Sequence, residues 1–192
     1  MIATLTTASP GGDEAAPASA VVVGNDADHY PATHFTDEYD RGDGWTLHAT
    51  GHNLIVNDCR KLLAALFASA VGYAGVQYWA VGSGLTTDLD SAPAPASPTD
   101  TRLRTEIARV PVTISFLDDL GQPMAGAGLS RVVRVQATFP EGTATGRNLE
   151  FGLFGGNATA TVNSGLLIDR VVHQAKYKES TEARRLTIDF TF

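Results

Sequence analysis

Histidines are the first residues of this chain whose type and spacing could do chemistry. His48 and His52 lie four residues apart, the spacing at which two imidazoles bind zinc from one face of a helix. Gly51 lies between them, and no glutamate stands where the general base of a zinc protease belongs. We therefore interpret both histidines as polar residues at the end of a strand.

Acidic residues form two further candidate sites. Asp26 and Asp28 offer the oxygen ligands that Ca²⁺ prefers, but the glycine and glutamate of an EF-hand loop are missing, so we interpret them as a surface cluster. Asp118, Asp119 and Glu141 follow predicted strands and could supply the two carboxyl groups of a glycosidase. Nothing in the sequence places these acids opposite each other.

The remaining reactive motifs are weak. Cys59 stands at the start of a predicted helix, where a thiolate is favoured, but no histidine pairs with it in the pattern, and we interpret it as a half-buried structural thiol. Arg41, Gly42 and Asp43 spell an integrin tripeptide that also reads as an ordinary turn. Neither a Gly-x-Ser-x-Gly elbow nor a phosphate-binding loop occurs. We therefore predict that the chain is not an enzyme and uses no cofactor or metal.

Aromatic side chains give the last candidate site. Trp45, Trp79 and Tyr73, if exposed, would form an interface or a stacking platform for the sugar rings of a host-surface glycan. Trp79 also belongs to an apolar run, and alternating aromatic positions such as Phe151 are more typical of a core. Both interpretations stay open at this stage.

Composition excludes several classes of protein. The 192 residues carry a net charge of −7, and all of it falls in residues 1–44, which hold eight acids and one base. No basic surplus exists for binding nucleic acid. The longest apolar run, 62–67, is too short to cross a bilayer, and residues 1–7 show no secretory signal pattern. The single cysteine excludes an internal disulfide.

The elements that would position these residues fall into two parts. Residues 1–44 are predicted to be an acidic N-terminal arm, either disordered or ordered against a partner, with one short strand at 20–24 and a long loop after it. Residues 45–192 are predicted to be a neutral β-rich body. An amphipathic helix at 58–69 and a Pro-rich connector at 82–98 interrupt its strands.

Alternation of apolar and polar residues supplies the fold prediction. The strand candidates are separated by Gly-rich turns and cover residues 45–50, 76–81, 112–117, 133–139, 149–153, 166–173 and 186–192. Residues 100–110 fit either a short helix or an extended segment. The pattern predicts a mainly β fold, an antiparallel β-sandwich or barrel-like sheet, with the helix covering one open side.

An ordered series of segments in 45–192 resembles a known family. The segments are GHNLIVNDCRKLL (51–63), YWAVGSGLTT (78–87), SPTDTRL (97–103), EIAR (106–109), ATFPEG (137–142), RNLEFGLF (147–154), SGLLIDR (164–170) and the final strand 186–192. In this order they resemble structural proteins of tailed bacteriophages, especially tail-fibre and baseplate-associated proteins. The acidic arm has no counterpart in that pattern.

The resemblance implies a structural component of a tailed-phage virion, made in the host cytoplasm. Its expected place is the tail, baseplate or fibre-attachment region, as a symmetric oligomer bound to copies of itself and to other virion proteins. A capsid-associated decoration or head-fibre protein, and a carbohydrate-binding β-sandwich that contacts the host surface, are the alternatives. We expect neither nucleic-acid binding nor membrane insertion.

Overall fold

The computed structural model describes residues 32–125 and 128–192, and half of these residues are in strands. The elements follow one another along the chain as β1 (Ala32–Asp40), β2 (Trp45–Gly51), β3 (Leu54–Ile55), α1 (Asn57–Phe67), β4 (Ala74–Gly82), β5 (Glu106–Pro111), β6 (Thr113–Leu117), β7 (Val132–Phe139), β8 (Gly146–Gly156), β9 (Leu166–Lys178) and β10 (Ala183–Thr191).

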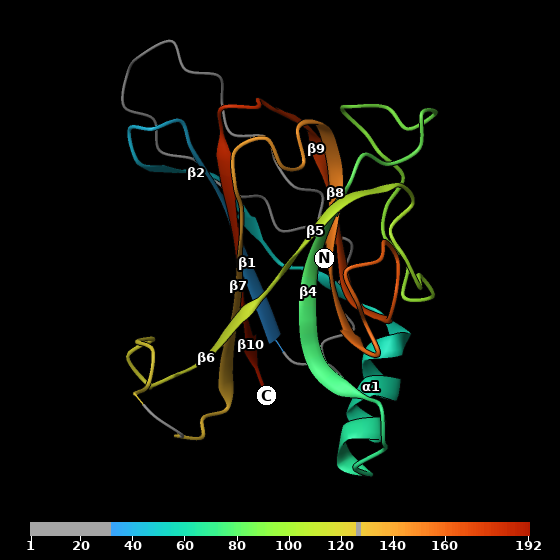
Figure 1. Ribbon diagram of the computed structural model, residues 1–192, viewed down its shortest axis with the longest axis vertical. Coiled ribbons are helices and arrows are strands. Elements are labelled where there is room, and N and C mark those ends of the chain that lie inside the picture. Colours follow the sequence, from blue (N-terminus) through green and yellow to red (C-terminus); the bar gives the residue numbers. More distant parts are fainter. Residues whose placement is uncertain (1–31, 126–127) are drawn as a thin grey trace, which may run out of the picture.

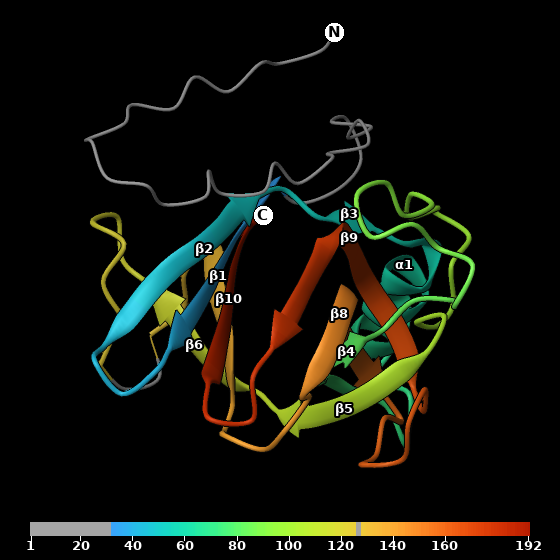
Figure 2. The ribbon, with the colours of Figure 1, turned by 90° about the horizontal axis from the view of Figure 1, so that it is seen from above.

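Ten strands form two antiparallel five-stranded sheets (Figures 1 and 2). Sheet A has the order β2-β1-β10-β7-β6, and sheet B has the order β3-β9-β8-β4-β5. The chain passes from the edge of sheet B to the edge of sheet A between β5 and β6, with only Val112 between the two strands. The prediction of a mainly β, antiparallel sandwich is confirmed, and the sheets do not close into a barrel.

The main hydrophobic core fills the space between the sheets. Sheet A contributes Phe35 and Ile188, and sheet B contributes Trp79, Phe151 and Leu153, each of them 0–2% exposed. The rings of Phe35 and Phe151 meet edge to face across the sandwich, with their centroids 5.2 Å apart. In most strands the core residues occupy every second position, so the alternation of apolar and polar residues in the sequence predicted them.

A second, smaller core lies on the other face of sheet B. Ala80 and Phe154, which alternate with the main-core residues of β4 and β8, pack there with Leu103 of the segment after the Pro-rich stretch. Both faces of sheet B are therefore covered, since residues 83–105 lie against the face that points away from sheet A (Figure 2). This explains the nearly continuous burial of β8.

The prediction that residues 1–44 are one arm is wrong for its last part. Residues 32–40 form β1, which lies inside sheet A and pairs with β10 along its whole length. Phe35 and Tyr39 of β1 are buried, but Asp37 lies between them on the same inner face and hides the apolar alternation. Residues 1–31, with the predicted strand at 20–24 and the acids Asp26 and Asp28, lie outside the described residues.

The helix and the strands of the body stand close to their predicted places. The helix begins at Asn57 and packs against β9 and β4, and its side chains Cys59 and Leu62 enter the main core. Residues 106–111 are extended, which settles the choice left open for that segment. The strands at 146–156 and 166–178 are each longer than the sequence pattern predicted. β8 continues through 146–148 at its start and 154–156 at its end, and β9 continues through 174–178.

Candidate functional site

The histidine pair does not form a joint site. His48 turns its ring toward Tyr39, with the centroids 5.4 Å apart, and burial lowers the pKa of its imidazole. His52 contacts the carbonyl oxygen of Thr33 through Nδ1, and its ring lies edge to face with that of His34. Across the described residues, no group of three or more His, Cys, Asp or Glu side chains could hold a metal ion.

The acids considered for glycoside hydrolysis lie at opposite ends of a strand. Asp118 follows β6 at the point where Leu117 pairs with Val132, the first residue of β7, whereas Glu141 lies two residues beyond Phe139, the last residue of β7. The length of β7 separates them by roughly 25 Å, well beyond the carboxyl spacing of a glycosidase. The Asp118 carboxylate instead accepts hydrogen bonds from the backbone N–H groups of Leu120 and Gln122 in its own turn.

Two other motifs have structural roles. Cys59 is buried, and burial raises the pKa of its thiol to about 12, so the group stays protonated and unreactive at neutral pH. Arg41 of the integrin-like tripeptide belongs to the β1–β2 turn, where its Nε lies 2.6 Å from a carboxylate oxygen of Glu182. That turn is closed by Asp40, whose carboxylate accepts the N–H groups of Gly42 and Gly44.

The three predicted stacking residues do not form a platform. Trp79 is fully buried between the sheets, so its ring is closed to a ligand and the interpretation as an exposed stacking residue is wrong for it. Trp45 begins β2 in sheet A and is 36% exposed, with the guanidinium of Arg185 4.3 Å above its ring. Tyr73 precedes β4 in sheet B and is 44% exposed. Alternation correctly favoured the core for Trp79.

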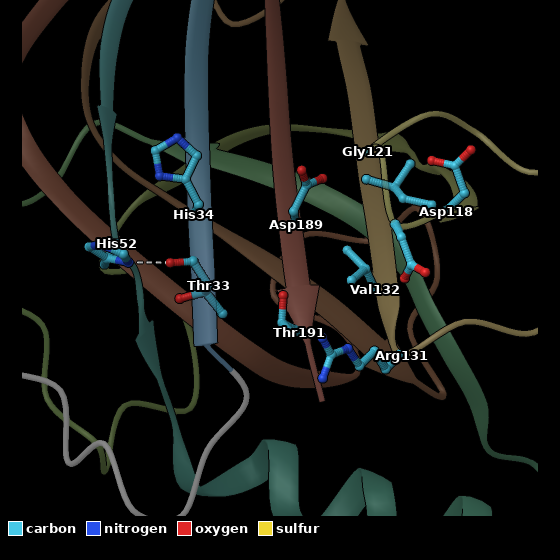
Figure 3. A pocket seen from close by; sticks show the side chains of 11 residues that line it. Thr33, His34, His52, Asp118, Gly121, Arg131, Val132, Asp189 and Thr191 are labelled. Carbon is cyan, nitrogen blue, oxygen red and sulfur yellow. Dashed lines mark hydrogen bonds between the residues drawn. The ribbon is translucent and has the colours of Figure 1, made fainter.

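A hollow of about 690 Å³ opens over the end of sheet A (Figure 3). His34 and Asp189 line it from the outer face of the sheet, and Arg131 and Asp118 line it from the β6–β7 connection. Two of its polar side chains have partners: Asp189 binds the guanidinium of Arg134 through both oxygens at 2.8 Å, and His34 Nε2 lies 2.9 Å from the hydroxyl of Thr50. The buried hydroxyl of Thr33, which also lines the hollow, has no hydrogen-bond partner among the described residues.

A buried charge pair occupies the interior of the sandwich. Arg184 of β10 donates from Nε and Nη2 to the two carboxylate oxygens of Asp37 at 2.9 Å, and the two residues are 0% and 1% exposed. Its Nη1 donates to the side-chain oxygen of Asn148 at 3.1 Å. The ring of Phe151 lies 5.4 Å from the guanidinium carbon. Sequence reasoning missed this pair because its members are 147 residues apart.

His173 lies beside this pair, and its protonation should destabilise the fold. Burial, and next the charge of Arg184, lower the pKa of His173 to about 4, although Asp37 opposes the shift. In the unfolded chain the imidazole has its ordinary pKa of about 6.5, so acidification from pH 6.5 to 4 protonates the unfolded state first. The contribution of His173 to stability is therefore present above pH 6.5 and is lost, by about 3 kcal/mol, toward pH 4.

The measurement is the free energy of unfolding of wild type and His173→Gln between pH 7 and pH 4. Burial raises the pKa of Asp169 to about 7, which acts in the opposite direction over the same range, so the difference between the two proteins isolates the histidine. We expect the wild type to lose about 3 kcal/mol relative to the variant on acidification. If the difference in the free energy of unfolding between wild type and His173→Gln does not change with pH, the lowered pKa of His173 is contradicted.

A second buried pair holds the end of the β4–β5 connection, residues 100–105 beyond the Pro-rich stretch, onto sheet B. The Glu150 carboxylate accepts from Nε and Nη2 of Arg170 at 2.8 and 2.5 Å, and the side chains are 1% and 2% exposed. Its other oxygen accepts the backbone N–H groups of Arg104 and Thr105 at 2.8 and 3.1 Å. Arg170 also binds Asp100 at 2.6 Å. We call this group, Glu150, Arg170, Asp100 and the two backbone N–H groups, the connector clamp.

Residues 78–87, 97–103, 147–154 and 164–170 supply most of these contacts. Gly82 is needed because a Cβ there would stand 2.7 Å from the carboxylate of Glu150, and Gly84 has a φ of +68°. Arg147 donates to the carbonyl oxygens of Ser83, Leu85 and Asp88, and so shapes the turn that follows. Arg147, Glu150 and Arg170 therefore hold the connection between β4 and β5 in place.

Exposed apolar side chains gather at the end of α1 and the turn after it. We call them the helix patch: Leu63, Leu66, Phe67, Val71 and Tyr73, which are 43%, 40%, 96%, 99% and 44% exposed. The helix was predicted to cover one open side of the fold, but of its apolar residues 62, 63, 66 and 67 only Leu62 is buried. Residues 62–87 carry no charge, so the patch is neutral as well as apolar.

None of the helices in the described part of the chain is long and apolar enough to span a membrane. In comparisons with protein-family models, curated proteins and solved structures, no match to this chain is found.

Proposed function

We propose that this protein is a structural component of a tailed-phage virion, placed in the tail, baseplate or fibre-attachment region as a symmetric oligomer. The resemblance of the ordered segments in residues 45–192 supports the family, and the helix patch is the observation that supports assembly. Phe67 and Val71 are almost fully exposed although they are large and apolar. Contiguous exposed apolar groups of this kind mark protein–protein contact sites.

The other contacts of the molecule agree with this role. Two buried charge pairs, Asp37 with Arg184 and Glu150 with Arg170, join β1 to β10 and β8 to β9. The body is therefore a rigid β-sandwich that offers surfaces for packing, and copies of itself and other virion proteins are the proposed partners. The glycan alternative loses support because Trp79 is buried away from solvent.

The test of the proposal is a Phe67→Ser, Val71→Ser double variant. Both side chains are exposed, so we expect the fold and its unfolding temperature to be retained. Each lost apolar contact weakens association by roughly tenfold, so self-association, measured by sedimentation, should fall by roughly 100-fold. Incorporation into particles should fall with it.

Leu89→Ser provides the matched control. Leu89 is 67% exposed but lies in the Pro-rich connector, outside the helix patch. We expect this variant to assemble like the wild type. If the double variant also assembles and enters particles like the wild type, the helix patch is not the assembly surface and the proposal loses its structural support.

A further inference from the structure

The four edge strands of the two sheets differ in how they are protected. β3 has only two residues, and β5 carries Glu106, Arg109 and Pro111. The free edge of β6 is already bonded within the chain, because Met124 N–H donates to the carbonyl oxygen of Phe116 at 2.8 Å. Short length, charges, proline and covering loops are the usual devices that stop a sheet edge from pairing with another chain.

The edge of β2 lacks most of this protection. Its seven residues include no proline, lysine, arginine or acid, and within the described residues only β1 pairs with it (Figure 2). Trp45, Thr46 and Leu47 are exposed at its start. Its remaining irregularity is a bulge at His48, which has no partner on β1 because Glu38 pairs with Leu47 and Asp37 with Ala49. The bulge limits regular pairing to the part of β2 before His48.

We propose that this part of β2 pairs with β2 of a second copy of the chain, antiparallel about a two-fold axis at Thr46. Trp45 of each copy then lies opposite Leu47 of the other, and the two Thr46 residues face each other. The two A sheets become one continuous ten-stranded sheet. The contact deepens the proposed function, on which it rests, by naming how one pair of subunits meets.

The side chains of β2 favour a second copy of the chain as its partner. Trp45 and Leu47 share the outer face of sheet A, since their partners on β1 are Asp40 and Glu38 and alternate residues of a strand share a face. Opposite residues of paired strands also share a face, so the aromatic ring of one copy covers the exposed leucine of the other. Because the pairing residues are uncharged, a copy can meet itself across the axis without bringing like charges together.

Cysteine cross-linking tests the position of the axis. Thr46→Cys should form a disulfide between two copies under mild oxidation, because residues that face each other across antiparallel strands bring their Cα atoms within reach of a disulfide. The native thiol does not interfere, since Cys59 is buried. Thr50→Cys is the control on the same strand. In the proposed pairing the two copies of Thr50 stand roughly 26 Å apart, too far for a disulfide.

Placing opposite charges at residue 46 tests the position of the two-fold axis independently. Thr46→Lys and Thr46→Glu should each raise the dissociation constant of the pair at least tenfold, because like charges then face each other across the axis. An equimolar mixture of the two variants should pair as well as the wild type, because every contact then joins lysine to glutamate. Sedimentation of each variant and of the mixture measures this directly.

The outcomes separate this contact from the proposed function. A Thr46 cross-link, no Thr50 cross-link and rescue in the mixture support the pairing. Assembly and particle incorporation without the Thr46 cross-link, or equal cross-linking at Thr50, overturn the pairing and leave the virion role standing. A Thr46 cross-link in a protein that is absent from particles overturns the role and leaves the pairing. A chain that stays monomeric at every concentration overturns both.

Discussion

An Asp37→Asn substitution should lower the free energy of unfolding by about 3–5 kcal/mol, because it leaves the buried guanidinium of Arg184 without its countercharge. The asparagine fits the same space, so the loss measures the charge rather than a cavity. Asn148 provides one remaining acceptor, the oxygen that already binds Nη1 of Arg184. Chemical denaturation monitored by the fluorescence of the buried Trp79 reads the stability of the sandwich itself.

The neighbouring residue supplies a matched control. Glu38 pairs with Arg185 through two hydrogen bonds of 2.8 and 2.9 Å, in the same β1–β10 ladder but on the outer face. These side chains are 22% and 26% exposed, so solvent screens their attraction, and Glu38→Gln should cost no more than about 1 kcal/mol. If Asp37→Asn and Glu38→Gln lowered the free energy of unfolding equally, burial would not determine how much the Asp37–Arg184 pair stabilises the fold.

A Glu150→Gln substitution should release the connector as well as destabilise the protein. It removes the countercharge of buried Arg170 and sets an amide against two backbone N–H donors, so we expect a loss of about 3 kcal/mol. Asp100 still binds Arg170, which keeps the loss at the lower end of the range for a broken buried pair.

Trypsin digestion reports the release of the connector separately from global unfolding. The peptide bond after Arg104 is held in place because the N–H groups of Arg104 and Thr105 both donate to Glu150. We expect native wild type to resist cleavage there and Glu150→Gln to be cut under conditions in which the sandwich stays folded. Asp189→Asn, which breaks an ion pair on the outer face of sheet A, is the control and should resist cleavage. Cleavage at equal rates in all three proteins would contradict the connector clamp.

β7 and β10 were predictable because each buries one face, and burial of one face imposes a period of two on the sequence. β8 is buried on both faces, but its sequence still alternates because Glu150 and Gly152 lie between Leu149, Phe151 and Leu153. The alternation of apolar and polar residues did not predict β1. Asp37 occupies a core position there, and a charged residue is compatible with the core only because Arg184, far along the chain, faces it. Periodicity within one strand carries no information about a partner in another strand.

The same limit explains the candidate sites. The helical spacing of residues 62–67 identified an apolar face, but it did not show that Phe67 stays uncovered by the chain's own strands. The acids and arginines of the connector clamp come from segments as far apart as Asp100 and Arg170, so no local spacing joins them. What the sequence pattern shows is which side a residue faces, and what lies opposite it depends on the tertiary fold.

The pairing of β1 with β10 gives the molecule a direction of mechanical weakness. Ala32 and Thr191 are partners at one end of this ladder, so tension applied between them would break the hydrogen bonds one after another from that end. Tension parallel to the strands, applied to opposite ends of β1 and β10, would instead act on all of their paired residues at the same time. A subunit pulled by the paired ends of β1 and β10 would therefore yield at its first residues, whereas one pulled along the strands would resist through the whole ladder.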